Sequence, residues 1–401
     1  RSPMKKIGIT GQSGFIGTHL YNTLGLYPGQ FERIPFEDNF FEEESKLRNF
    51  VTQCDVIVHL AALNRHHDPK VIYDTNILLV KKLISACEAT GSKPHIIFSS
   101  STQEESDNPY GHSKREGRKL FEEWAEKNGA GFTGLIIPNV FGPFGNPYYN
   151  SVVATFCHQL THNEEPVIDV DREIKLIYVG ELVEVILKII QGHSVSQSGN
   201  TESHSAEKTN LCNTVYNTVK HCETIPVQYT SVVKVSELLK ILITFKEDYF
   251  KKGIFPDLSN TFYRNLFNTF VCYLDHSSFF PFPLEVKKDH RGSFTEVVKI
   301  SSGGQVSFST TRPSVTRGNH FHTRKAERFA VIKGRARIQL RRIGTEKVLS
   351  IDLDGERPSF VDMPVWYTHN ITNTGKDDLY TIFWTNEHYN PEDPDTYYEE
   401  V

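Results

Sequence analysis

Three groups of residues in this chain have the side-chain types and spacing that chemistry requires. The first is the run Gly11-Gln12-Ser13-Gly14-Phe15-Ile16-Gly17, which directly follows a short apolar segment. Glycines at this spacing let backbone N–H groups at the start of a helix approach a pyrophosphate closely, and the positive end of the helix favours the negative charge. The run therefore predicts a dinucleotide-binding turn.

The second group is the pair Tyr110 and Lys114, which lie one turn apart on one face of a predicted helix. A free tyrosine has a pKa of about 10, and a neighbouring ammonium lowers it by favouring the phenolate. Such a pair can exchange a proton with a carbonyl or an alcohol, although most pairs at this spacing are ordinary surface residues. Here three serines, residues 99–101, precede it at the end of a predicted strand, where parallel sheets bind ligands.

The third group joins three imidazoles and one carboxylate. His320 and His322 are two residues apart, and hence on one face of a strand, while Glu327 and His369 follow later in the chain. This donor set suits Zn²⁺ or another divalent ion such as Fe, Mn or Ni. The alternative is a vestigial cluster in a domain that serves only dimerisation.

Two periodicities predict the elements that position these groups. As far as about residue 160, short β-branched runs alternate with amphipathic stretches, which is typical of strand–helix units around a parallel sheet. The expected strands are 5–10, 55–61, 95–99 and 133–137, and the expected helices are 14–24, 74–90 and 110–128. After residue 284 the period is two, with expected strands at 293–299, 329–332, 336–340, 348–353 and 379–384.

This pattern predicts a fold of two domains. We expect a Rossmann-type, doubly wound α/β domain at 4–245 with a polar insertion at about 193–223, a connector at 246–283 and an all-β barrel at 284–401.

Composition excludes several classes of protein. With 44 Lys and Arg against 49 Asp and Glu, the chain offers no broad basic surface for a nucleic acid. No segment approaches the roughly 18 apolar residues of a membrane helix, and we expect no signal peptide. The 6 cysteines show no framework spacing, which indicates reduced thiols in a cytoplasmic protein.

The N-terminal two thirds resembles the extended short-chain dehydrogenase/reductase family, which includes nucleotide-sugar epimerases, dehydratases and reductases. The ordered motifs that carry the resemblance are residues 11–17, Val58-His59-Leu60-Ala61-Ala62, Asn76, Ser99-Ser100-Ser101, Tyr110-Gly111-His112-Ser113-Lys114 and Pro138-Asn139-Val140-Phe141-Gly142-Pro143. The resemblance implies that Tyr110 is the acid or base, that Lys114 bonds the nicotinamide ribose, and that Ser101 holds the substrate oxygen.

The same resemblance implies an NADP(H) or NAD(H) site and substrate contacts from Asn139 and Asn150. The cofactor-binding residues that it implies are Gly11, Ser13, Gly14, Phe15, Ile16, Gly17, Leu60, Ala61, Ala62, Asn76, Tyr110 and Lys114. Ile136 departs from the family, which often has an arginine there. A second strand, expected near residues 31–36, ends without a clear ribose or phosphate ligand, so Glu37, Asp38, Arg33 and Arg65 leave the choice between NAD and NADP open.

The C-terminal region resembles the cupins. The first cupin motif is complete from Gly318 to Gly334, and the second is present as Pro364, His369 and Asn373, with Trp366 where cupins usually have glycine.

The segment 289–296 also resembles cupin epimerases that act on 4-keto-6-deoxy nucleotide sugars. In those enzymes the residue matching Arg291 meets the nucleotide diphosphate, and the histidine matching His320 is a general base. Because His322, Glu327 and His369 complete the metal pattern, we favour His320 as a ligand. The base stays unassigned, with Tyr367 and His290 as candidates.

Together the halves resemble the bifunctional capsular polysaccharide enzymes of the CapF type. This implies a homodimer in which the cupin domain epimerises C3 of UDP-2-acetamido-2,6-dideoxy-hexos-4-ulose and the reductase domain reduces C4 with NADPH. The implied product is UDP-2-acetamido-2,6-dideoxy-L-talose, on the route to UDP-N-acetyl-L-fucosamine. Two alternatives stay open: a monofunctional 4-reductase with a structural cupin, and a non-catalytic regulator that senses NAD(P).

Overall fold

The structure is a computed structural model, and it describes residues 4–192, 222–290, 292–295, 297–300 and 303–401. The chain divides into two compact units, Arg1–Val140 with Lys175–Thr230, and Phe141–Ile174 with Ser231–Val401. The expected domain limits at 245/246 and 283/284 stay predictions. Most of the expected insertion lies outside the described residues, but its last two residues, Cys222 and Glu223, begin a strand.

The first unit is built on a parallel sheet of six strands in the order β2-β1-β3-β4-β5-β8. Its sheet strands are β1 (Lys5–Thr10), β2 (Phe31–Ile34), β3 (Val56–His59), β4 (His95–Ser101), β5 (Phe132–Ile137) and β8 (Cys222–Pro226). Its helices are α1 (Phe15–Leu24), α2 (Glu44–Gln53), α3 (Pro69–Thr90), α4 (Pro109–Asn128) and α6 (Val179–Gln191), with short 3-10 turns at Asp38–Phe41 and Thr102–Glu105. The strands β6 (Asn139–Phe141) and β7 (Glu173–Tyr178) lie where the chain passes between the units.

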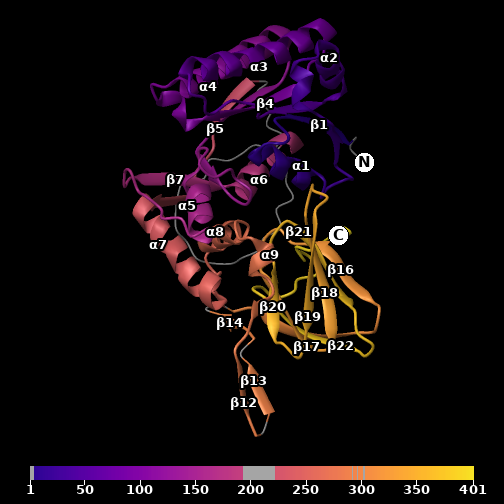
Figure 1. Cartoon of the computed structure of the whole chain (residues 1–401). Coiled ribbons are helices and arrows are strands. Elements are labelled where there is room, and N and C mark those ends of the chain that lie inside the picture. Colours follow the sequence, from indigo (N-terminus) through magenta and orange to yellow (C-terminus); the bar gives the residue numbers. More distant parts are fainter. Residues whose placement is uncertain (1–3, 193–221, 291, 296, 301–302) are drawn as a thin grey trace, which may run out of the picture. The chain divides into compact units, whose positions relative to one another are not determined.

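Helices cover both faces of this sheet. Leu47 of α2, Leu83 of α3 and Phe121 of α4 pack on one face, whereas Leu20 of α1 and Ile186 of α6 pack on the other (Figure 1). Strand side chains alternate between these two cores, as buried parallel strands require. The prediction of a doubly wound sheet is therefore confirmed, and α2 is a helix that the sequence analysis did not expect.

The second unit is mainly antiparallel. Its strands are β9 (Ser231–Lys234), β10 (Ile254–Phe255), β11 (Phe282–Pro283), β12 (Val286–Asp289), β13 (Gly292–Thr295), β14 (Lys299–Ile300), β15 (Gln305–Thr311), β16 (Thr316–Phe321), β17 (Glu327–Lys333), β18 (Arg335–Arg342), β19 (Val348–Asp354), β20 (Ser359–Met363), β21 (Tyr367–Asn373), β22 (Leu379–Thr385) and β23 (Tyr397–Tyr398). Its helices are α5 (Val152–Thr161), α7 (Val235–Phe245), α8 (Thr261–Val271) and α9 (His276–Phe279), and a π-helical turn, Lys246–Phe250, follows α7.

Two five-stranded sheets enclose the core of this unit, in the orders β11-β20-β17-β22-β15 and β19-β18-β21-β16-β23. Their inner faces meet in a core that includes Ile338, Leu353, Phe360 and Leu379. The predicted all-β cupin fold is confirmed in this form. The expectation of one strand over 293–299 is wrong, because β13 pairs with β12 in a hairpin while β14 pairs with β10.

Two further findings bear on the sequence-based expectations. Among the helices that the structure describes, none is long and apolar enough to cross a membrane. The described cysteines are free thiols, namely Cys54, Cys87, Cys157, Cys222 and Cys272, and Cys212 lies outside the described residues.

A buried ion pair ties β17 to β20. The Arg328 guanidinium, 1% exposed, donates to both carboxylate oxygens of Asp362 at 2.7 and 2.9 Å and to the carbonyl of Gly253 at 2.8 Å. The Tyr249 hydroxyl donates to the same carboxylate at 2.7 Å, and the Phe360 ring lies under the guanidinium. The network therefore satisfies both buried charges.

Removing one partner should be costly. We expect Asp362→Ala to lower the free energy of unfolding by about 3–5 kcal/mol, because it leaves the Arg328 charge buried without a counter-charge. Denaturant unfolding measures this loss. The exposed pair Arg337–Asp352 offers a matched control, and Asp352→Ala should change stability by less than about 1 kcal/mol. Equal losses in the two variants would contradict the assignment.

Candidate functional sites

The glycine turn lies between the carboxyl ends of β1 and β3. The chain leaves β1 toward β2 on one side and returns to β3 on the other, so the strand order reverses at this point, where doubly wound folds bind ligands. Gly11 has φ +70, and a Cβ there would lie 2.8 Å from the Ala61 nitrogen. At Gly17 a Cβ would lie 2.1 Å from the Gly11 oxygen. Only glycine therefore allows this approach of loop, strand and helix.

The start of α1 has no side chain as a cap. Gly14 occupies the N-cap position, so no side chain of that residue accepts a hydrogen bond from the first helical N–H groups. Such donors are available to an anion. The fold thus brings Gly11, Ser13, Gly14, Phe15, Ile16 and Gly17 together around one turn.

Asn76 holds the segment that follows β3. Its side-chain oxygen accepts from the Leu63 nitrogen at 2.6 Å, and its amide donates to the Leu63 oxygen and to the Ser113 hydroxyl, both at 3.0 Å. This links the 60–63 segment to α4. The Asn76 side chain therefore fixes the segment Leu60-Ala61-Ala62, which follows β3.

The Tyr110–Lys114 pair begins α4. The Asn108 side chain caps this helix by accepting from the Gly111 nitrogen at 2.7 Å, and Pro109 occupies its first turn. The Lys114 nitrogen lies 5.6 Å from the centroid of the Tyr110 ring and donates to the Ser99 carbonyl at 2.9 Å. Lys114 thereby connects α4 to the end of β4, where Ser101 is half-buried.

Burial controls the charge of Lys114. Desolvation lowers its pKa to about 8, against the opposing effect of the Glu104 carboxylate. Glu104 is itself held by Arg118, which donates to both of its oxygens at 2.8 Å, and by the Ser100 hydroxyl. Sequence analysis missed Glu104, because its partners lie 4 and 14 residues away in no recognised motif.

Three further residues were predicted to contact the substrate, namely Asn139, Asn150 and Arg291, and Arg33 was a candidate phosphate ligand. Asn139 is exposed and donates to the Lys175 carbonyl at 3.4 Å, and Asn150 is exposed in the second unit. Arg291 lies outside the described residues. The Arg33 guanidinium stacks over Tyr21 at 4.2 Å, away from the glycine turn.

Asp38 meets the glycine turn instead, because its carboxylate accepts from the Ser13 hydroxyl at 3.4 Å. An acidic side chain at this place in a dinucleotide site can accept a hydrogen bond from a ribose hydroxyl.

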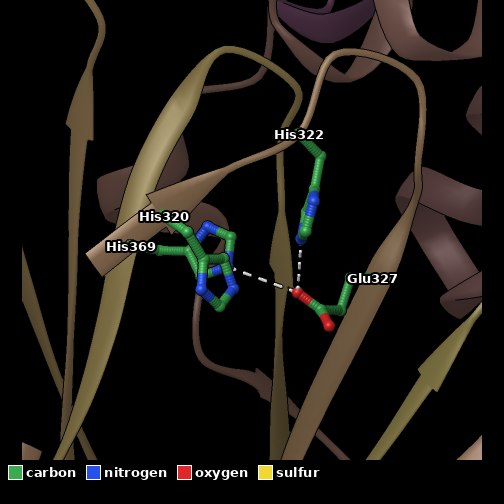
Figure 2. Close-up of side chains that lie close together, drawn as sticks. All are labelled: His320, His322, Glu327 and His369. Atoms are coloured by element: carbon green, nitrogen blue, oxygen red, sulfur yellow. Dashed lines mark hydrogen bonds and ion pairs between the residues drawn. The ribbon is translucent and has the colours of Figure 1, made fainter. Parts of the chain in front are cut away.

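The second site lies between the two β sheets of the other unit. His320 comes from β16, His322 from the residue after β16, Glu327 from the start of β17 and His369 from β21. One ligand atom from each lies within 4.8 Å of the others. Figure 2 shows His322 and Glu327 facing His320 and His369 across the space between them.

Distances within the cluster centre on one carboxylate oxygen. Glu327 Oε2 lies 3.1 Å from His322 Nε2 and 3.3 Å from His369 Nε2. His322 Nδ1 bonds the Asp395 carbonyl at 2.6 Å, and His369 Nδ1 bonds the Tyr367 carbonyl at 3.1 Å. A carbonyl only accepts, so both Nδ1 atoms carry a proton and both Nε2 atoms face the centre. Burial disfavours the charged form of His322, but the Glu327 carboxylate outweighs this effect and raises the pKa of that imidazole.

This arrangement fits a divalent cation. His369 Nε2 is buried without a hydrogen-bond partner, and three imidazoles with one carboxylate are the donors that Zn²⁺ and related ions prefer. Backbone carbonyls that fix the ring orientation are typical of metal-binding histidines.

Burial and charge act on the cluster in opposite directions. Burial raises the pKa of Glu327, but the His322 and His369 imidazoles outweigh it and hold that pKa well below its usual range. Burial, together with the neighbouring His369 and His322, lowers the pKa of His320 to about 3. His320 is therefore a neutral base at physiological pH, as a metal ligand requires.

A pocket of about 190 Å³ opens onto this cluster. Its lining includes His320, Glu327 and His369, together with Arg317 and Ser309. The two candidate bases do not line it: His290 is exposed, and Tyr367 is half-buried with the His276 ring 5.2 Å away.

The conformation of Trp366 explains how this residue can stand where cupins usually have glycine. It has φ +62, the left-handed conformation that glycine usually supplies, and it is buried against Phe321 with ring centroids 5.5 Å apart. Its backbone nitrogen donates to the His322 carbonyl at 2.8 Å. The indole therefore packs beneath the segment that carries His320 and His322 and does not line the pocket.

Two positioning residues escaped the sequence analysis. The Thr10 hydroxyl lies 2.7 Å from His59 Nδ1 and accepts a hydrogen bond from the Ala61 nitrogen at 3.4 Å. These contacts hold the end of β1 against the segment that follows β3. Asp395 contacts His322 from 73 residues away. No local spacing could have signalled either contact, although His59 belongs to a motif seen in the sequence.

Comparison with known proteins finds a family model for each half of the chain. Residues 7–201 match the model of the NAD dependent epimerase/dehydratase family, and residues 287–397 match that of the polysaccharide biosynthesis C-terminal domain. Membership of the first family implies a nicotinamide cofactor of the NAD(P) type.

Relatives match almost the whole chain. A curated protein of Pseudomonas aeruginosa, UDP-2-acetamido-2,6-beta-L-arabino-hexul-4-ose reductase, is 33% identical over 393 residues, which are 98% of each chain. The crystal structure of the capsular polysaccharide assembling protein CapF from Staphylococcus aureus is 33% identical, with a TM-score of 0.59 over 99% of this chain and 100% of that one. A structure of CapF with the inhibitor 3-isopropenyl-tropolone is 31% identical, with a TM-score of 0.56 over the same shares of the two chains. The chain therefore belongs to the CapF family of capsular polysaccharide assembling proteins.

Proposed function

We propose that this chain is a bifunctional nucleotide-sugar enzyme of capsule synthesis, which inverts C3 of a UDP-2-acetamido-2,6-dideoxy-hexos-4-ulose and reduces its C4 ketone. One observation carries the proposal: a Tyr–Lys pair at the carboxyl edge of a parallel sheet and a pocketed His/Glu cluster occur in one chain. The name of the Pseudomonas aeruginosa relative supports the 4-keto sugar and the reduction.

Reduction uses the first site. The nicotinamide, when bound, supplies a hydride to C4 of the sugar. Tyr110 donates its phenolic proton to the C4 oxygen as the negative charge develops, which completes the alcohol. The Lys114 ammonium favours the phenolate that is left behind, and Ser101 holds the C4 oxygen by a hydrogen bond.

Epimerisation uses the second site. Inverting C3 requires removing a proton next to the ketone and returning one to the opposite face. His320, His322, Glu327 and His369 would hold a divalent ion, which would supply a positive charge opposite the developing enolate oxygen. The carbonyls of Asp395 and Tyr367 fix two of the rings, so that their Nε2 atoms stay directed at the centre of the cluster.

We propose NADPH as the hydride donor from the likeness to the CapF enzymes, and UDP-2-acetamido-2,6-dideoxy-L-talose as the product. The Asp38 carboxylate beside Ser13 argues the other way, because it would repel a 2′-phosphate at that point. Rates measured with NADPH and with NADH decide between them.

A second candidate function is a monofunctional 4-reductase with a structural cupin unit. The name of the Pseudomonas aeruginosa relative mentions reduction alone and so favours this second function. The two functions differ in whether solvent hydrogen enters C3 when no nicotinamide is present.

The first prediction concerns the metal cluster. We expect His369→Ala to abolish incorporation of solvent deuterium at C3, because it removes a ligand, while nicotinamide binding is unchanged. NMR of the 4-keto sugar nucleotide incubated in D₂O without cofactor measures this. The exposed His388 gives the control His388→Ala, which should exchange like the wild type. Unchanged exchange in His369→Ala would end the metal-dependent epimerase role.

The second prediction separates the two sites. We expect Tyr110→Phe to slow the reduction by about 10²–10⁴-fold, the usual contribution of a positioned acid, while deuterium still enters C3. Oxidation of NADPH, followed by absorbance, measures the first effect and NMR the second. Tyr27→Phe, at an exposed position, is the matched control. Loss of both activities would contradict two independent sites.

The third prediction is a pH dependence. The pKa of Lys114 is lowered to about 8, so its ammonium is present below that pH and lost above it. We therefore expect kcat/KM of the reduction to fall as the pH rises through about 8, since kcat/KM reports the groups of the free enzyme. In Lys114→Met the rate should be low throughout, without this fall. A wild-type profile that is flat between pH 7 and 9 would contradict the role of Lys114.

A further inference from the structure

Residues 393–398, which we call the C-terminal clasp, run beside the His/Glu cluster. Two of these residues form β23, which pairs with β16 through His320 and Phe321. Asp395 lies just before β23 and is 1% exposed. The clasp therefore contacts the strand that carries one proposed ligand and leads directly to another.

The Asp395 carboxylate accepts four hydrogen bonds from the turn that joins β16 to β17. One oxygen accepts from the Thr323 nitrogen at 3.0 Å and from the Thr323 hydroxyl at 2.6 Å. The other accepts from the nitrogens of Arg324 and Lys325, both at 2.9 Å. This turn is the short connection between His322 and Glu327, so the carboxylate fixes the spacing of two proposed ligands.

The backbone of the same residue acts on the imidazole itself. The Asp395 carbonyl accepts a hydrogen bond from His322 Nδ1 at 2.6 Å, and this orientation of the ring makes His322 Nε2 face Glu327. One residue thus sets the turn with its side chain and the ring orientation with its main chain.

The conformation of Asp395 explains why its residue type matters. Its φ is +41, in the left-handed region that asparagine, aspartate and glycine tolerate best. Glycine would accept this conformation but lacks the carboxylate. Asparagine would keep the shape, but its amide would replace one oxygen and turn N–H groups toward two N–H donors.

The turn makes further contacts with neighbouring residues. Arg324 donates to Glu387 at 3.2 and 3.0 Å and to Asp393 at 3.1 Å, and Lys325 donates to the Thr396 hydroxyl at 3.1 Å. Asp393 is largely exposed and has no contact with His322 among those that the structure shows. It provides a comparison residue within the same segment.

We propose that Asp395 is a positioning residue for the divalent-ion site, which orients His322 and sets the distance between His322 and Glu327. The inference rests on the proposed metal-dependent function, because it assumes that the cluster binds an ion. The inference assigns a role at this site to a residue that follows Thr323, in the turn, by 72 positions.

The experiment compares Asp395→Asn with Asp393→Asn in the full chain. Affinity for Zn²⁺ is measured by competition with a chromophoric chelator, without substrate or nicotinamide. We expect Asp395→Asn to weaken binding by about 10–100-fold, as the loss of a residue that orients a ligand usually does, and Asp393→Asn to bind like the wild type. Amide hydrogen exchange of the metal-free protein should rise at residues 323–325 in Asp395→Asn alone.

A graded variant keeps the test decisive if Asp395→Asn does not fold. Thr323→Val removes one of the four hydrogen bonds to the carboxylate and should weaken Zn²⁺ binding less, by a few fold. Zn²⁺ affinity equal to the wild type in the Asp395 variant, or in Thr323→Val when that one alone folds, would overturn the positioning role. If wild-type protein bound Zn²⁺ but incorporated no deuterium at C3, the proposed epimerase function would fail while the role of Asp395 stood.

Discussion

A buried carboxylate surrounded by imidazoles is the constraint around which the β unit is organised. An ionised carboxylate away from water costs several kcal/mol unless positive or hydrogen-bonding groups meet it. Glu327 is 6% exposed, and two imidazole nitrogens lie within 3.3 Å of one of its oxygens. Those rings must in turn be held by carbonyls, which come from Asp395 and Tyr367. The position of the clasp, the turn before β17 and the conformation of Trp366 all follow from that one demand.

The reductase unit solves the opposite problem with a buried cation. Lys114 is 3% exposed, and the carbonyl of Ser99 accepts a hydrogen bond from its ammonium group. Nearby Glu104 offsets the desolvation only in part, which is why the pKa of Lys114 stays lowered. A charge kept at the edge of ionisation is suited to proton transfer, whereas the fully compensated charge of Glu327 is suited to holding an ion. The two sites therefore differ in how completely their buried charge is satisfied.

Sequence periodicity and motifs were sufficient for the type of each sheet and for the members of the His/Glu cluster, because both depend on local spacing. The glycine run predicted the turn after β1, and H-x-H with a later glutamate predicted residues that the fold brings within 4.8 Å. Contacts that join distant segments escaped, since nothing near Asp395 indicates His322 and nothing near Glu104 indicates Arg118. The expected strand over 293–299 was wrong because strand pairing, and not period, divides that segment. Arg33, a candidate phosphate ligand because of its charge, makes another contact that the sequence did not indicate, since its guanidinium packs on the Tyr21 ring.

The ion pair between Arg328 and Asp362 has a consequence beyond stability. These residues stand directly opposite each other on β17 and β20, and Glu327 is the next residue along β17, opposite Met363. An apolar pair would tolerate a slip of the strands by two residues, because the same faces would stay buried. A slip here would separate two buried charges. The ion pair thus specifies the strand register, and with it the depth at which Glu327 enters the pocket.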